Sequence, residues 1–225
     1  MIKAVVFDLF ETLITEWISN KYLSSRCAED LGIDKSLFNA AWERYGHALN
    51  CGEMTYHQVL RCICREAGVS PDEGILSDCE KKRIAGKDQC FDFVCGDVLT
   101  LLAGLKQQGM KLALCSNCSA EEVQRLSASP LYPYFDAVLL SYECGMAKPD
   151  REIYLGCAGA LSVAPEECLF VGDGGSDELW GAQEAGMHPL RALWFLEKYH
   201  PFVKPLPFPA AQHPHNVLAI IHEFL

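Results

Sequence analysis

A short apolar segment near the N-terminus leads directly into an acidic residue, and this feature constrains the fold more than any other part of the sequence. Residues 4–7 read Ala-Val-Val-Phe and are followed by Asp8. The apolar residues do not alternate with polar ones, which is typical of a strand buried on both faces in a parallel sheet. A carboxylate at the carboxyl end of such a strand lies at the edge where open α/β sheets bind ligands. Because an unpaired buried carboxylate is costly, Asp8 either caps a turn or has a partner such as a metal ion or a substrate.

Three further apolar segments follow, and each precedes polar residues that are able to take part in chemistry. These polar residues are Ser116 and Asn117 after residues 112–115, Lys148 after residues 137–141, and Asp173 and Asp177 after residues 169–171. Strands that alternate with helical segments predict a doubly wound parallel α/β sheet. If the strands lie side by side, their carboxyl ends meet at one edge, and we expect Asp8, Ser116, Lys148 and Asp173 to converge there.

The segment from Trp17 to Ala85 differs from the rest, because its apolar residues are spaced three and four apart. This spacing is typical of helices. We expect a small all-α cap of four helices over residues 16–85, inserted into an α/β core of residues 1–15 and 86–225. Aromatic residues of this cap, such as Trp42 and Tyr56, either form its core or line a substrate pocket.

The rest of the core predicts further helices and one more strand. The expected helices cover residues 97–109, 119–127, 150–161, 177–186 and 216–225, an edge strand covers residues 191–195, and a Pro- and His-rich loop covers residues 200–215. The glycine at position 109 is expected to end the first of these helices.

Charge and composition exclude several classes of partner. The formal net charge of −11 argues against nucleic acids and anionic membranes. No segment reaches the roughly 18 apolar residues of a membrane span, and Asp8 and Glu11 interrupt the N-terminal apolar run that a signal peptide needs. We therefore expect a cytoplasmic protein, a monomer or homodimer, that binds a small molecule. Its 12 cysteines are expected to be reduced and mostly buried.

The order of the strand-end residues carries a resemblance. Asp, Ser-Asn, Lys and a pair of Asp residues at the ends of successive strands resemble the haloacid dehalogenase-like hydrolase superfamily. The resemblance covers residues 1–14 and the chain from about residue 90 onward, and the inserted helices have the position and size of the cap of many members. It implies that Asp8 is a nucleophile that forms an aspartyl-phosphate. It also implies a Mg²⁺ ion bound by the Asp8 side chain, the Phe10 backbone carbonyl and Asp173.

The resemblance also implies roles for the other strand-end residues. Ser116 is expected to hold phosphoryl oxygens, and Lys148 to neutralise charge on Asp8 and on the transferring group. Asp177 is expected to orient Lys148 or a metal-bound water. Asn117 either belongs to the site or only shapes its loop.

Phe10 departs from the pattern of phosphatases in this superfamily, which usually carry a second Asp there as general acid and base. Three alternatives follow. The first is a Mg²⁺-dependent phosphatase whose substrate, such as an acyl phosphate, has a leaving group that needs little protonation. The second is a 2-haloacid dehalogenase, since these enzymes resemble this motif with an aromatic residue at that position, and the third is a catalytically impaired binding protein.

Asp173 favours the phosphatase of a small phosphorylated metabolite, because a second carboxylate beside Asp8 requires a cation and the dehalogenases work without a metal. The sequence also lacks the early cap arginine that those dehalogenases use. Glu11 is not expected to replace the acid, because successive strand side chains point to opposite faces.

Overall fold

A parallel sheet forms the centre of the computed structural model, which describes residues 1–70, 72–200 and 202–223. The six strands lie in the order β3-β2-β1-β4-β5-β6, and every neighbouring pair is parallel. Their bounds are β1 Ala4–Phe7, β2 Lys111–Ser116, β3 Ala137–Leu140, β4 Cys168–Gly172, β5 His188–Ala192 and β6 Ala210–Ala211. The predicted doubly wound α/β fold is therefore confirmed.

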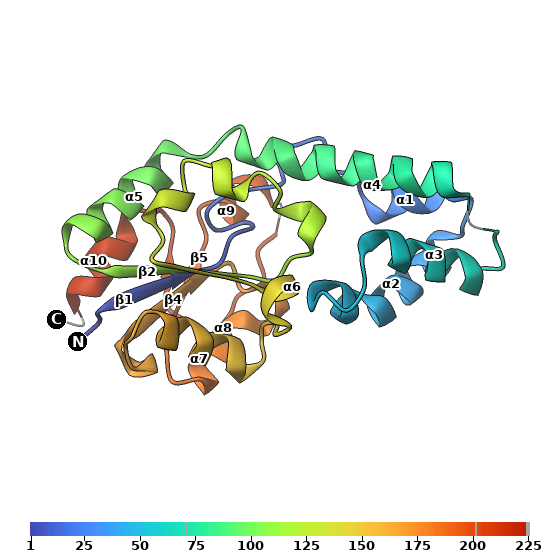
Figure 1. The fold of residues 1–225 in the computed structure, drawn as a ribbon. Coiled ribbons are helices and arrows are strands. Elements are labelled where there is room, and N and C mark those ends of the chain that lie inside the picture. The colour runs from blue at the N-terminus through green and yellow to red at the C-terminus, as the bar shows by residue number, and fades with distance from the viewer. Residues whose placement is uncertain (71, 201, 224–225) are drawn as a thin grey trace.

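Helices cover both faces of the sheet, so that β1 is buried on each side (Figure 1). Val5 and Phe7 pack in one apolar cluster with α5 and α10, whereas Ala4 and Val6 pack in a second cluster with α7 and α8. All four side chains are fully buried. The helices of the core are α5 Gly96–Gln107, α6 Ser141–Cys144, α7 Arg151–Ala160, α8 Glu178–Glu184, α9 Leu196–Tyr199 and α10 Asn216–Glu223. Burial on two faces explains the uninterrupted apolar sequence of β1.

Four helices follow β1 in the sequence and precede α5, and they share an apolar cluster of their own. In space they lie beyond the edge of the sheet where α6 follows β3 (Figure 1). They are α1 Ser24–Asp30, α2 Lys35–Asn50, α3 Tyr56–Glu66 and α4 Glu73–Asp88. The helix starts follow the sequence, because Asp34 caps α2 and Thr55 forms a capping box at the start of α3. The predicted division of the chain at residue 85 falls within α4, which continues to Asp88. We call residues 16–88 the cap.

Short 3-10 turns complete the described elements. They are η1 Gln89–Phe91, η2 Ala120–Glu122, η3 Leu126–Ala128, η4 Tyr132–Tyr134, η5 Pro165–Glu167 and η6 Gly175–Asp177. The helix expected at 119–127 was wrong, since η2 and η3 occupy this segment. Glu121 and Glu122 are held there by basic side chains of the cap rather than by the positive end of a helix.

The prediction of an edge strand at residues 191–195 is also wrong, because the strand there is β5 and it is not at the edge of the sheet. β5 lies between β4 and the two-residue strand β6, which comes from the segment expected to be only a loop. The Arg191 backbone N–H donates to the Pro209 carbonyl at 2.8 Å, and the N–H of Leu193 donates to the Ala211 carbonyl at 2.9 Å. Two paired residues within a Pro-rich segment leave no periodic signal in the sequence. None of the helices in the described ranges has the length and apolar character needed to cross a membrane.

Candidate active site

Asp8 lies directly after β1, and both its backbone and its side chain make hydrogen bonds in the core. Its backbone N–H donates to the Val171 carbonyl of β4 at 2.9 Å, which extends the parallel pairing by one residue. Its side chain is buried: Oδ1 accepts from Lys148 Nζ at 2.5 Å, and Oδ2 accepts from Thr12 Oγ1 at 3.1 Å. These two contacts fix the plane of the carboxylate at the edge of the sheet.

Lys148 is buried between two carboxylates. Its Nζ lies 2.5 Å from Asp8 Oδ1 and 2.5 Å from Glu178 Oε2, and its side chain is 3% exposed. Asn117 fixes the backbone of Lys148, since the Asn117 amide donates to the Lys148 carbonyl at 2.7 Å and accepts from the Lys148 N–H at 2.7 Å. Asn117 therefore positions the lysine that contacts Asp8.

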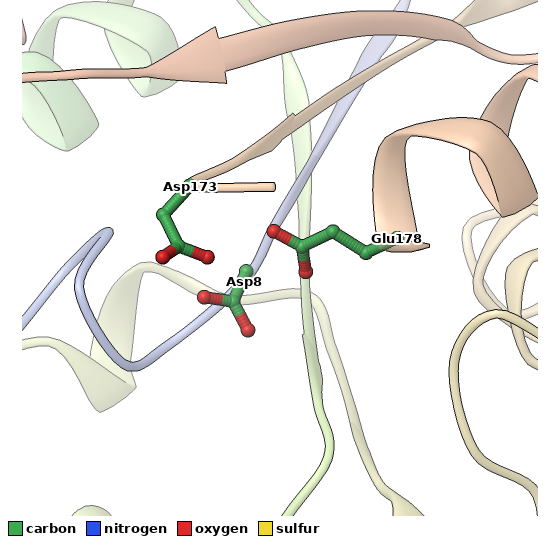
Figure 2. A group of neighbouring side chains, drawn as sticks. All are labelled: Asp8, Asp173 and Glu178. Atoms are coloured by element: carbon green, nitrogen blue, oxygen red, sulfur yellow. The ribbon is translucent and has the colours of Figure 1, made fainter. Parts of the chain in front are cut away.

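Three carboxylates converge at this edge of the sheet, with oxygens of Asp8, Asp173 and Glu178 within 4.8 Å of one another (Figure 2). Burial raises the pKa of Asp8, and Asp173 adds to this effect while Lys148 opposes it. Burial likewise raises the pKa of Glu178 well above its usual range. Among the described residues, Lys148 is the one basic side chain ion-paired to any of the three. The group therefore favours the binding of a further cation, and its all-oxygen donor set is of the kind that Mg²⁺ prefers.

Asp177 does not have the position expected for it. Asp177 is exposed and, like Ser176, has a left-handed backbone with φ near 53°, so the segment from Asp173 to Asp177 is not a turn of α-helix. The next residue, Glu178, begins α8 and binds Lys148 instead. The contact with Lys148 expected of Asp177 is thus made by Glu178. A role of Asp177 toward a metal-bound water stays a prediction. The glycines at 174 and 175, which favour a break rather than a helical turn, are the signal that could have shown this.

The loop after β4 is built closely around Glu178. Oε1 of Glu178 accepts from the Gly174 N–H at 3.0 Å, and a Cβ atom on Gly172 would lie 2.2 Å from the same oxygen. A larger residue at position 172 would therefore displace the Glu178 carboxylate from Lys148. Asp173, in turn, accepts from the Gly175 N–H at 2.9 Å and remains partly exposed.

Ser116 ends β2 beside β1 and has a buried hydroxyl without a partner. Among the described residues, its Oγ is one of the few buried side-chain polar atoms that make no hydrogen bond. Buried hydroxyls are nearly always paired, so this one is suited to a ligand atom.

The segment after Asp8 places an aromatic ring and not an acid next to the site. Phe10 is partly buried, and Lys87 Nζ of the cap lies 4.1 Å from the centroid of its ring. The carboxylate of Glu11 accepts from Thr15 Oγ1 at 2.6 Å and from the Glu16 N–H at 2.9 Å. Glu11 is thus engaged away from Asp8. A metal contact from the Phe10 carbonyl stays a prediction.

A cavity of about 270 Å³ lies within the cap, and Glu122 of the core completes its lining. Its lining includes the aromatic residues Phe38, Trp42 and Tyr56 and the charged residues Glu16, Arg83, Lys87 and Glu122. The Arg83 guanidinium lies over the rings of Trp42 and Tyr56, at 5.3 and 4.9 Å from their centroids. These two rings therefore both line the cavity and pack against its charged wall.

The charged side chains that line the cavity form ion pairs with one another and with Glu121. Arg83 binds Glu121 at 3.0 Å and Glu122 at 2.7 Å, and Lys87 binds Glu122 and Glu16 at 2.7 Å each. Burial acts to raise the pKa of Glu122, but the attraction of Lys87 and Arg83 outweighs it and lowers the pKa to about 2. The pairs join residues far apart in the chain, and no local pattern in the sequence indicated them.

Comparison with known proteins gives one consistent family. A family model described as haloacid dehalogenase-like hydrolase matches residues 2–186. A glyceraldehyde 3-phosphate phosphatase of Methanopyrus kandleri is 30% identical over 85% of this chain and 84% of its own. A phosphoserine phosphatase of Thermus thermophilus is 38% identical over 72% of this chain and 65% of its own.

Solved structures share the fold. A 2-haloacid dehalogenase of Pseudomonas syringae superimposes with a TM-score of 0.69 at 20% identity, covering 100% of both chains. An enzyme of the same family from Bacteroides thetaiotaomicron, in complex with magnesium and inorganic phosphate, has a TM-score of 0.59 at 21% identity over 85% of this chain and 94% of its own.

Proposed function

Since the chain belongs to the haloacid dehalogenase-like hydrolase family, we propose that it is a Mg²⁺-dependent phosphatase of a small phosphorylated metabolite that works through an aspartyl-phosphate. One observation carries the proposal: the Asp8, Asp173 and Glu178 carboxylates lie within 4.8 Å of one another, against the single ammonium of Lys148. Such a group is stable in its charged form only with a further cation. The phosphatase relatives support the substrate class.

Asp8 is the nucleophile in this proposal. Its carboxylate attacks phosphorus, the bond from phosphorus to the leaving oxygen breaks, and water later hydrolyses the aspartyl-phosphate. Lys148 and Thr12 hold the two carboxylate oxygens in place for this attack. The unpaired Oγ of Ser116 donates to a phosphoryl oxygen.

Asp8, Asp173 and the Phe10 carbonyl would hold Mg²⁺. When bound, the ion neutralises phosphoryl charge as a Lewis acid. Both oxygens of Glu178 are engaged by Lys148 and Gly174. Glu178 therefore serves to position Lys148.

A dehalogenase is the second candidate, and Phe10 is the observation that favours it. Halide leaves without a proton, so an aromatic residue at this position costs such an enzyme nothing. Asp173 argues against it, because without a metal ion this carboxylate would raise the pKa of Asp8 and favour protonation of the nucleophile.

Removal of divalent metal is expected to lower phosphate release by about 10²-fold or more, since the metal supplies several kcal/mol of charge stabilisation. The test is a panel of phosphate esters and acyl phosphates assayed with Mg²⁺ and with a chelator, beside halide release from 2-haloacids. Re-addition of Mg²⁺ after chelation is the control. Halide release that needs no metal would instead establish the dehalogenase. The absence of both activities would indicate a catalytically impaired binding protein.

A further inference from the structure

Lys87 connects the cap to the residue that replaces the usual acid. It lies near the C-terminal end of α4, its side chain is 12% exposed, and its Nζ is 4.1 Å from the centroid of the Phe10 ring. Phe10 is two residues from Asp8. A cap residue thus places a positive charge over the position at which phosphatases of this family usually carry a carboxylic acid.

Lys87 also lines the cavity of the cap, together with Glu16 and with Glu122 of the core. Phosphoryl transfer places the attacking and leaving oxygens roughly in line, on opposite sides of phosphorus. Asp8 attacks from the end of β1, and the cap lies beyond this edge of the sheet (Figure 1). The leaving group therefore extends toward the cap, from which Lys87 reaches the ring of Phe10.

The contacts of Lys87 leave one donor for this purpose. An ammonium has three N–H donors. Two of them are accounted for by Glu16 and Glu122, at 2.7 Å each. The remaining contact is with the face of the Phe10 ring. An ammonium over an aromatic ring loses little interaction energy when one of its N–H donors turns to a charged oxygen. The charge-assisted hydrogen bond that it gains is stronger than the cation–π contact that it loses.

We propose that Lys87 is a catalytic residue that stabilises the negative charge developing on the leaving oxygen, in place of the carboxylic acid that Phe10 removes. The inference rests on the phosphatase function proposed above. As Asp8 bonds to phosphorus, the bond to the leaving oxygen breaks and its electron pair stays on that oxygen. Lys87 donates a hydrogen bond to the oxygen and remains an ammonium, and water supplies the proton that completes the alcohol.

The test compares Lys87→Met with the wild type over substrates whose leaving groups differ in basicity. Para-nitrophenyl phosphate and acetyl phosphate have good leaving groups, whereas glycerol phosphate and ethyl phosphate have poor ones. We expect kcat/KM of Lys87→Met to be close to that of the wild type for the good leaving groups, and about 10²-fold lower for the poor ones. The dependence of the rate on leaving-group basicity thus becomes steeper.

Lys82→Met is the matched control. Lys82 lies on the same helix, binds Asp30 at 2.6 Å and lies over the ring of Tyr22, but it is not part of the cavity lining. This variant is expected to retain the wild-type dependence. Lys87→Arg keeps the positive charge and is expected to restore part of the activity on alkyl phosphates.

We expect Lys87→Met to fold, because both carboxylates that lose Lys87 keep another basic partner. Glu122 remains paired with Arg83, and Glu16 remains paired with Lys21. A loss of equal size for every substrate would assign Lys87 a merely structural role and overturn the inference, as would an unchanged profile. Failure of Lys87→Arg to recover any alkyl phosphate activity would contradict a role of the charge. A folded wild type that hydrolyses none of the esters would overturn the phosphatase function itself, and this inference with it.

Discussion

Asp8→Asn is expected to lower kcat by at least about 10⁴-fold, because an amide oxygen does not replace the carboxylate as a nucleophile. The fold should survive. The amide oxygen introduced by the substitution would still accept a hydrogen bond from Lys148, which also keeps its 2.5 Å contact with Glu178. The variant also removes one of three mutually repelling carboxylates. We therefore expect the free energy of unfolding, measured without divalent metal, to equal or exceed that of the wild type.

Asp92→Asn is the control for this substitution, since Asp92 forms an exposed ion pair with Arg125 at the surface. Its activity and stability are expected to match those of the wild type. Phosphate release in single-turnover and steady-state assays gives kcat, and chemical denaturation gives stability. Substantial turnover by a homogeneous Asp8→Asn preparation would contradict the assignment of Asp8 as nucleophile.

Lys148→Met is expected to affect both activity and stability. The substitution leaves Asp8 and Glu178 buried without their shared cation, and breaking a buried pair from one side typically costs about 3–5 kcal/mol. Loss of the charge that faces the transferring group is expected to lower kcat by about 10³-fold. Both effects are measured on the same preparation, by denaturation and by phosphate release.

The neighbouring acids give a matched comparison for this result. Glu178→Gln weakens the second contact of Lys148 and should reproduce part of its effect on kcat. Asp177→Asn, at an exposed position, should stay within about twofold of the wild type. If Asp177→Asn were the more damaging of the two, Glu178 would not be the residue that positions Lys148.

The sequence allowed the fold class and the meeting of four strand ends to be predicted, because both follow from local pattern. The uninterrupted apolar run of β1 indicates burial on two faces, and its parallel pairing with β2 and β4 brings Ser116 and Asp173 to the same edge as Asp8. The ion pair of Lys148 with Asp8 agrees with the expectation that this lysine neutralises charge there.

The features of the site that could not be predicted from the sequence depend on the exact path of the backbone, or on contacts between residues far apart in the chain. Glu178 takes the place expected for Asp177 because two residues with left-handed backbone delay the start of α8. The contacts of Lys87 with Glu122 and Phe10 join segments that no periodicity relates. Both depend on single side chains, and a shift of one residue at Glu178 would change which group contacts Lys148.

A crystal structure of the protein with Mg²⁺ tests the central claim most directly, namely that a divalent cation joins Asp8 to Asp173. We predict an ion bound to one carboxylate oxygen of each residue, at the roughly 2.1 Å typical of Mg²⁺, with Lys148 still on Asp8. Carboxylates of Asp8 and Asp173 that point apart, with no ion between them at saturating Mg²⁺, would contradict the account.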